Sequence, residues 1–197
     1  ILLNNKFLEK ILEVKKESNI YLSMPWLYDN NLKKVSRLIN AKNIKNIKCF
    51  WYSNSKMRYG FRRKFDKSIY FIQDIISHIL SILSILLKNE KLNYKIKFCS
   101  KEKNYEFLEF DFNQYDIRLK CNRSHRVNKK QIVFNLFEGG SYIINIGSNF
   151  VSFYHNNLLV YKEKSLKDNI LKQYKDILTN KFKHKLISKN NIKKINL

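Results

Sequence analysis

Six short segments with the pattern of β-strands follow one another in the second half of the chain, with no helix between them. They alternate apolar with polar residues or are rich in β-branched and aromatic residues, which is typical of strands. The segments are 94–98, 105–112, 115–121, 132–137, 142–146 and 150–154. Strands joined by short turns pair antiparallel, because parallel pairing needs a long crossover connection. The sequence therefore predicts a mostly antiparallel, open β-sheet.

One long apolar helix is available to cover such a sheet. Residues 69–87 are apolar on nearly all sides, with Gln73, Asp74 and His78 as interruptions, and Asp66 can cap the start of the helix. Because ionisable groups are costly in lipid, a buried helix is favoured over a membrane span. We therefore expect this helix to pack on one face of the sheet.

The first part of the chain predicts a helix–strand–helix–strand unit. The helices are 5–17 and a segment capped by Asp29, and the strands are 20–26 and 44–52. The apolar stripe of the second helix consists of Leu32, Val35, Leu38 and Ile39. An amphipathic helix over 166–177 closes the pattern. The expected fold class is α+β, with residues 1–180 as one domain and 181–197 as a basic tail.

The formal net charge of +23 suggests a polyanionic partner. However, the cations are 32 lysines and only seven arginines, and the lysines are spread along the whole chain beside many asparagines and isoleucines. Base readout and bidentate phosphate contacts favour the planar guanidinium group of arginine. The charge therefore indicates a compositional bias more than nucleic-acid binding, with a small basic RNA-binding or ribosomal protein as the alternative.

The cysteines set limits on metal and redox chemistry. Cys49, Cys99 and Cys121 are odd in number, far apart and without a CxxC or Cys/His spacing. Neither a disulfide framework nor a metal site is therefore expected, and a reducing compartment such as the cytoplasm is the simple inference. The chain begins with Ile1 and shows no signal-peptide pattern, which suggests a fragment of a longer protein.

Asp74 and His78 carry the candidate chemistry. They lie four residues apart on the long helix, so both side chains project from one face. One interpretation is structural: a buried histidine whose ring is satisfied by a carboxylate one turn away. The other is catalytic. A hydroxyl that loses hydride from its carbon must also lose its proton, and an imidazole can accept that proton at neutral pH.

The order of these elements, with the sequence QDIISHILSIL over residues 73–83, resembles a known family. It is similar, over about residues 1–180, to the C-terminal domain of the glucose-fructose oxidoreductase, inositol dehydrogenase and rhizopine catabolism (Gfo/Idh/MocA) oxidoreductases. The resemblance implies the substrate side of an NAD(P)-dependent oxidoreductase, which transfers hydride between nicotinamide and a hydroxyl of a sugar, nucleotide sugar or cyclitol. It also implies that His78 is the acid/base and Asp74 its partner.

The resemblance nominates two substrate-binding residues as well. Trp26 lies in the segment that corresponds to the family's substrate-pocket lining, and a plain core tryptophan is the alternative. Asn54 corresponds to a polar residue that contacts substrate after the next strand, and a turn asparagine is the alternative. The sequence departs from the family at Ile76, where many members carry a glycine that allows close approach to the cofactor or sheet.

A dinucleotide-binding turn is absent, because the four glycines form no GxGxxG motif. The NAD or NADP implied by the resemblance would be bound mainly by an N-terminal Rossmann half missing from this chain, so the chain alone is expected to be inactive. The expected partners are a small sugar-type substrate and further copies of the chain in a homo-oligomer formed through the open sheet, rather than a membrane or nucleic acid. A second alternative is an inactive oligomerisation module with the same fold.

Overall fold

A computed structural model describes residues 25–54, 71–88, 93–102, 105–147, 150–164 and 169–179. Within these ranges, eight strands form one sheet in the order β2-β3-β4-β1-β5-β6-β7-β8. The strands are β1 (Ile44–Asn54), β2 (Tyr94–Glu102), β3 (Tyr105–Phe112), β4 (Tyr115–Asn122), β5 (Ser124–Leu136), β6 (Ser141–Ile146), β7 (Phe150–His155) and β8 (Leu158–Lys164). The helices are η1 (Pro25–Tyr28), α2 (Asn30–Leu38), η2 (Ala41–Asn43), α4 (Phe71–Leu86) and α5 (Asn169–Leu178).

The sheet is mixed, open and mostly antiparallel, which confirms the predicted α+β class. Strands β2 to β4 and β5 to β8 pair antiparallel with their neighbours in the sequence. Strand β1 is inserted between these two groups, parallel to β4 and antiparallel to β5. The parallel pair was not predicted, because strand periodicity does not specify which distant strand becomes the neighbour.

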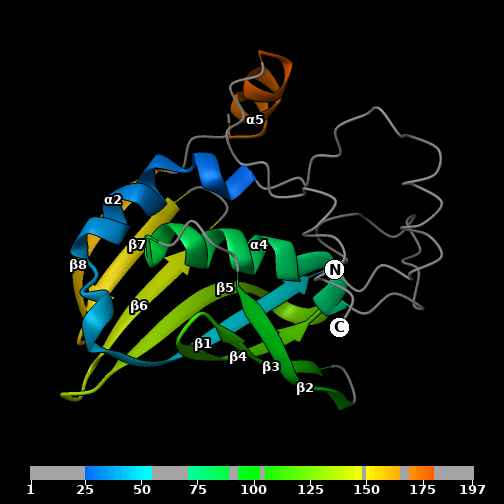
Figure 1. Cartoon of the computed structure of the whole chain (residues 1–197), viewed down its shortest axis with the longest axis vertical. Helices are drawn as coiled ribbons and strands as arrows, with labels where there is room; N and C mark the ends of the chain where they lie inside the picture. Colours follow the sequence, from blue (N-terminus) through cyan, green and yellow to red (C-terminus); the bar gives the residue numbers. More distant parts are fainter. Residues whose placement is uncertain are drawn as a thin grey trace.

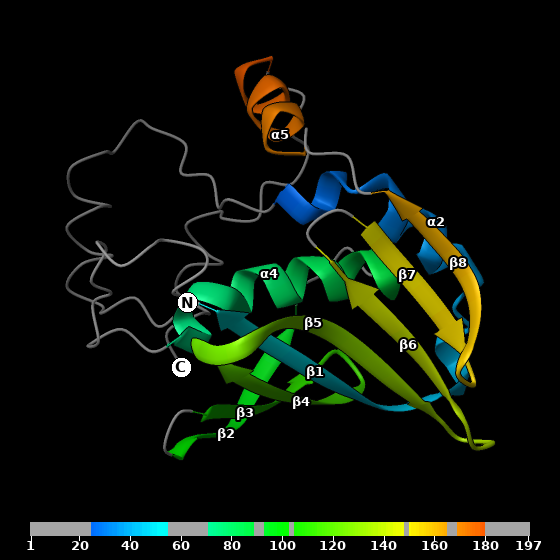
Figure 2. The same cartoon turned by 180° about the vertical axis from the view of Figure 1, so that it is seen from behind.

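One face of the sheet is covered by α2 and α4, which cross it on the same side in both views (Figure 1, Figure 2). Along β3 the residues alternate between buried and half-buried, so that Leu108, Phe110 and Phe112 point toward the helices. From α4, Ile79 and Ile82 fill the space above them and are at most 1% exposed. Each fully buried side chain of this kind contributes roughly 1.5–3 kcal/mol, so this interface provides most of the core.

The long apolar segment is a helix of the core, as the sequence predicted. Helix α4 covers 71–86, and within it Ile75, Ile76 and Leu83 are all buried. Among the described helices, none is both long and apolar enough to span a bilayer. Ile76 is buried. Its side chain therefore lies between the backbone of α4 and the core, whereas a glycine at this position would allow the helix backbone to come closer.

The predicted cap of the second helix is confirmed. The Oδ1 atom of Asp29 accepts the backbone N–H groups of Asn31 at 2.9 Å and Leu32 at 3.0 Å, which satisfies two of the free donors at the start of α2. Leu32 and Val35 are fully buried, but Leu38 is 45% exposed. The prediction that Leu38 belongs to the apolar stripe was therefore wrong, because the residue lies in the last turn, beyond the edge of the core.

The strand predicted over 20–26 does not extend to its expected end. Pro25 and Trp26 belong to the 3-10 helix η1, since proline lacks the N–H that a strand pairing needs. The rest of that strand, the predicted helix 5–17, the Asp66 cap and the basic tail 181–197 all lie outside the described residues. The division into a 1–180 domain and a tail therefore stays a prediction.

Strands β5 and β6 pair through a glycine turn. Gly139 and Gly140 have φ of 87° and 78°, a left-handed conformation that favours glycine, and they join β5 to β6. Strand β8 was not predicted, because its residues are nearly all exposed and show no alternation. It forms the edge of the sheet, and the last helix, α5, lies against η1 away from the sheet (Figure 1).

Candidate functional site

The N-terminal end of α4 is held by a carboxylate from the sheet. The buried side chain of Glu106 on β3 accepts the backbone N–H of Ile72 through Oε2 at 2.9 Å. The first N–H groups of a helix have no partner within the helix, and the helix dipole favours a negative charge at this end. The bond therefore fixes the start of α4 against β3, and with it the residues on the following turns.

Four neighbouring strands place a row of side chains across the covered face below this part of α4. In the register of the sheet, Glu106 lies opposite Cys121, Cys121 opposite Trp51, and Trp51 opposite Lys130. The next row on the same face is entirely apolar and consists of Leu108, Leu119, Cys49 and Ile132. The covered face thus changes from apolar to mixed polar and aromatic at the level of Trp51.

His78 reaches this row from α4. Its ring stacks on the indole of Trp51, with ring centroids 6.1 Å apart and planes 9° apart. Trp51 also meets Trp26 from η1 edge to face, with centroids 6.4 Å apart and an angle of 89°. Trp51 is only 4% exposed, whereas Trp26 and His78 are half-buried. Trp51 is therefore the buried support that orients the imidazole and holds Trp26 beside it.

The helix backbone around His78 is fixed as well. The hydroxyl of Ser81, a fully buried residue, donates to the carbonyl oxygen of His78 at 2.9 Å. The Nδ1 atom of His78 is shielded from solvent by protein atoms. The ring is thus held on one side by the core while the residue as a whole keeps part of its surface exposed.

Lys130 adds a positive charge to this cluster. Its Nζ lies 4.7 Å from the ring centroid of Trp51 and 5.4 Å from that of Trp26. A cation over an indole face is attracted by about 0.5–2 kcal/mol, depending on how far it is desolvated. A second cation, Arg123 in the turn after β4, lies 5.2 Å from the ring centroid of Phe71 at the start of α4. This end of the covered face therefore combines aromatic rings with cations.

The structure brings two of the four sequence-predicted site residues together. Trp26 and His78 both contact Trp51 and so belong to one cluster. Asn54 lies at the end of β1, where its backbone N–H donates to Oδ1 of Asn128 on β5 at 2.6 Å. The backbone of Asp74 belongs to α4 one turn before His78, but its side chain lies outside the described part of the chain. The roles assigned to these four residues stay predictions.

Three residues at this end of the covered face were not predicted as site residues from the sequence: Trp51 and Lys130, which belong to the cluster, and Glu106, which lies in the same row of the sheet. Trp51 is one more apolar residue in a strand, and Lys130 is one of many lysines. A signal was nevertheless present in the strand alternation. Glu106 is in phase with the buried Leu108, and Lys130 is in phase with the buried Ile132. Charged residues at such positions are rare in a core and often serve a site.

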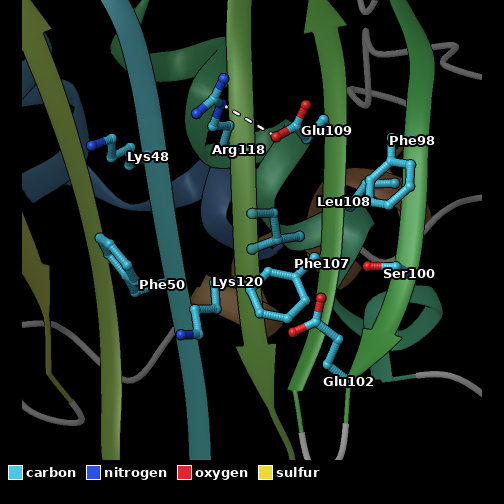
Figure 3. Close-up of a pocket in the computed structure, with 11 residues that line it drawn as sticks. Lys48, Phe50, Phe98, Ser100, Glu102, Phe107, Leu108, Glu109, Arg118 and Lys120 are labelled. Atoms are coloured by element: carbon cyan, nitrogen blue, oxygen red, sulfur yellow. Dashed lines mark ion pairs between the residues drawn. The ribbon is translucent and has the colours of Figure 1, made fainter.

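A cavity of about 290 Å³ lies on the opposite face of the sheet (Figure 3). Its walls are the alternate side chains of β1 to β4, among them Lys48, Phe50, Phe107 and Lys120, which point away from the helices. Arg118 on this face is paired with Glu109, with Nε and Oε1 3.3 Å apart. The cavity is therefore separated from His78 by the sheet and belongs to the open face.

The element order and topology define an α+β domain with the fold of the substrate domain of Gfo/Idh/MocA-type dehydrogenases. The chain is similar to D-galactose-1-dehydrogenase from Rhizobium etli, with a TM-score of 0.62 and 13% identity over 90% of this chain and 59% of that one. It is also similar to a dehydrogenase (MviM) from Clostridium difficile, with a TM-score of 0.52 and 14% identity over 87% of this chain and 55% of that one.

The likeness to these dehydrogenases is one of fold. No family model and no curated protein matches the sequence. The chain spans less than two thirds of either solved neighbour. The resemblance seen in the sequence is thus confirmed for the architecture, and the activity has to be argued from the residues of the site.

Proposed function

We propose that this domain is the substrate side of an NAD(P)-dependent oxidoreductase that acts on a hydroxyl of a sugar, nucleotide sugar or cyclitol. The observation that carries the proposal is the cluster of His78, Trp51 and Trp26 at one end of the covered face. It presents a proton-accepting ring in a fixed orientation beside a half-buried aromatic surface. Binding sites for small molecules combine apolar and aromatic surfaces with a few polar groups in defined positions. The shared fold with dehydrogenases supports the same function.

In this mechanism His78 accepts the proton of the substrate hydroxyl. Since Nδ1 is shielded by the protein, Nε2 is the ring nitrogen that would meet the hydroxyl. Trp51 keeps the plane of the ring fixed, so that little orientation has to be gained on binding. Asp74 would fix the tautomer of His78 from one turn away, and Asn54 would bind a further substrate hydroxyl. The C–H face of the sugar ring would pack on Trp26.

The described residues do not fit the phosphates of a dinucleotide. Pyrophosphate groups bind at the N-terminus of a helix after a glycine-rich turn, and the N-terminus of α4 already holds the carboxylate of Glu106. That negative charge would repel a phosphate. The nicotinamide, which supplies the hydride acceptor when bound, would therefore be held mainly by a Rossmann half outside this chain.

The direct test is an assay of the complete protein with NAD⁺ or NADP⁺ and a panel of sugars, nucleotide sugars and cyclitols. Deuterium placed on the carbon to be oxidised should appear on the reduced nicotinamide. Absence of substrate-dependent reduction with every member of the panel would contradict the proposal. Retention on RNA that weakens steeply with salt, together with no reduction, would favour the RNA-binding alternative.

The proposed function includes a homo-oligomer formed through the open face of the sheet. This face carries exposed rings such as Phe98, which is 53% exposed, and charges of both signs such as Arg118 and Glu109. Apolar patches with a polar rim are typical of protein interfaces. Light scattering of the native protein and of Phe98→Asp tests this, since the charge should give a smaller assembly. An assembly without turnover would favour the inactive oligomerisation module.

We also place the protein in the cytoplasm. Cys49, Cys99 and Cys121 are all free thiols, and Cys99 is exposed. Free thiols are kept reduced in the cytosol, whereas an oxidising compartment favours disulfides. Microscopy of the complete protein with a fluorescent tag tests the location, and accumulation in a secretory compartment would contradict it.

A further inference from the structure

Helix α5 carries exposed apolar side chains along one side. Leu171, Tyr174 and Leu178 are 68%, 59% and 83% exposed, and Leu178 is the most exposed large apolar residue in the described part of the chain. Tyr174 and Leu178 follow Leu171 by three and seven residues, so the three side chains lie within about 60° of one another around the helix axis. A surface helix normally turns such a stripe toward the core. The α5 stripe, which consists of these three residues, is instead left open.

The opposite side of α5 is held by η1. The two elements pack against each other, and α5 stands clear of the sheet in both views (Figure 1, Figure 2). Burial and a hydrogen bond from its hydroxyl to the carboxylate of Asp176 raise the pKa of Tyr28 to about 12. Helix α5 has ten residues, and helices of this length have little stability without tertiary contacts. Contact with η1 covers one side of the helix, and a second contact along the stripe would stabilise it further.

The α5 stripe lies close to the candidate site. Besides α5, η1 also packs against α4, the helix that carries His78. It also contains Trp26, which meets Trp51 edge to face. In the proposed function, a Rossmann half outside this chain brings the nicotinamide to a substrate held at His78. That half therefore has to lie against this end of the domain, where the stripe is.

The order of the chain favours the same partner. An N-terminal half is connected to this domain through the residues that precede η1, so it is joined at the element against which α5 packs. The chain spans 59% and 55% of the two solved neighbours, so further chain accompanies this fold in both of them. An exposed apolar patch beside such a connection is suited to an interface between two domains.

We propose that the α5 stripe is the contact surface for the Rossmann half of the complete protein, so that α5 holds that half beside η1 and the candidate site. The inference rests on the presence of the Rossmann half in the proposed function, but not on hydride transfer. The contact is apolar. Each leucine that passes from water into such a contact favours docking by about tenfold or more.

Cross-linking of the complete protein identifies what covers the stripe. Lys175 is exposed and lies next to the stripe on α5, so a short lysine-reactive cross-linker followed by mass spectrometry reports its neighbours. Mixing isotope-labelled with unlabelled protein separates links within one chain from links between copies. We expect Lys175 to link to lysines of the Rossmann half of the same chain. The control is Lys48, which lies on the open face of the sheet and should not link to that half.

Three results of this experiment would overturn the inference. They are links from Lys175 only to residues 181–197, links only to a second copy, and links from Lys48 to the Rossmann half as frequent as those from Lys175. The first two results would identify a different occupant of the stripe. The third would show that the links do not report a specific contact.

The double variant Leu171→Asp with Leu178→Asp tests the stripe itself. It should lower the yield of the cross-links from Lys175 to the Rossmann half several-fold, because a carboxylate is costly to bury in an apolar contact. Both leucines are exposed, so the domain should keep its fold, which circular dichroism verifies. Leu158→Asp, at a leucine on β8 that is 73% exposed, is the matched control and should leave the yield unchanged. An unchanged yield in the folded double variant would contradict the role of the stripe.

Failure of the proposed function gives a different result. Cross-links from Lys175 to the Rossmann half, in a protein that reduces no nicotinamide with any substrate, would contradict hydride transfer and leave the contact in place. Substrate-dependent reduction by a protein whose Lys175 links only to residues 181–197 or to a second copy would retain the function and overturn the contact.

Discussion

The imidazole of His78 lies parallel to the indole of Trp51, with their planes 9° apart, although the two residues come from a helix and a strand. The indole is almost completely buried, so its own orientation is fixed by the core. A ring stacked on a fixed plane loses little further freedom when a substrate binds. This relationship connects the packing of the domain to its proposed chemistry, and it can be tested at several points.

Trp51→Leu should destabilise the domain and loosen His78. Replacement of a buried tryptophan leaves a cavity, and truncations of this type cost about 3–5 kcal/mol for alanine, so leucine should cost somewhat less. Urea denaturation measures the loss. Trp26→Leu is the matched control, because Trp26 is half-buried and should cost clearly less. Equal losses for the two variants would contradict the supporting role of Trp51.

Glu106→Ala should reduce stability by leaving the start of α4 without its acceptor. A hydrogen bond to a charged group contributes about 1.5–3 kcal/mol, and Glu106→Gln should recover part of it because an amide oxygen still accepts the Ile72 N–H. The control is Glu109→Ala, which removes an exposed ion pair with Arg118 and should cost at most about 1 kcal/mol. Identical unfolding midpoints for both alanine variants would contradict the stabilising role of the hydrogen bond between Glu106 and Ile72.

Asp29→Ala should remove the cap of α2. Loss of such a cap costs about 0.5–2 kcal/mol, and Asp29→Asn should retain most of the stability because asparagine caps equally well. Denaturation curves of the two variants check this. A similar loss for asparagine would show that the charge of Asp29, rather than its bonds to Asn31 and Leu32, stabilises the helix.

The burial of the cysteines predicts which of the three thiols react with a thiol reagent. Burial raises the pKa of Cys49 to about 12, and burial together with nearby Glu106 raises the pKa of Cys121, whereas Cys99 is exposed. A maleimide at pH 8 should therefore label one thiol in the native protein and all three after unfolding. Early labelling of Cys49 would contradict its burial.

The raised pKa of Cys49 also affects the stability of the domain at alkaline pH. In the unfolded chain a thiol ionises near pH ~8.5, whereas folded Cys49 stays protonated up to about 12. Above pH ~8.5 the unfolded state therefore binds fewer protons than the folded state, and the free energy of unfolding should fall as the pH rises toward 12. Cys49→Ala should reduce this slope, and a slope unchanged in that variant would assign it to other groups.

Much of the fold follows from local patterns in the sequence. The alternation of β3 and the capping of α2 by Asp29 depend on neighbouring residues, and both were predicted correctly. The pairing of β1 with β4 and β5 depends on contacts between distant segments, which periodicity does not encode. Strand β8 was missed because an exposed edge strand needs no apolar alternation.

The candidate site also combines features that local sequence patterns predict with features that depend on contacts between distant segments. The spacing of Asp74 and His78 identified the helix that carries the candidate base, because helix geometry is local. The neighbours of His78 come from β1, η1 and β5, and only the register of the sheet brings Trp51 and Lys130 side by side. A single lysine in a lysine-rich chain carries no visible signal until the strand phase is known. The partners of the base therefore required the structure.

The most direct test of the central claim is the turnover of His78→Ala in the complete protein. We expect kcat to fall by about 10²-fold or more, with the dissociation constant of the nicotinamide cofactor changed by no more than a few fold. His155→Ala, at the exposed end of β7, is the matched control and should turn over like the native protein. Unchanged kcat in a folded His78→Ala variant would contradict the assignment of His78 as the acid/base.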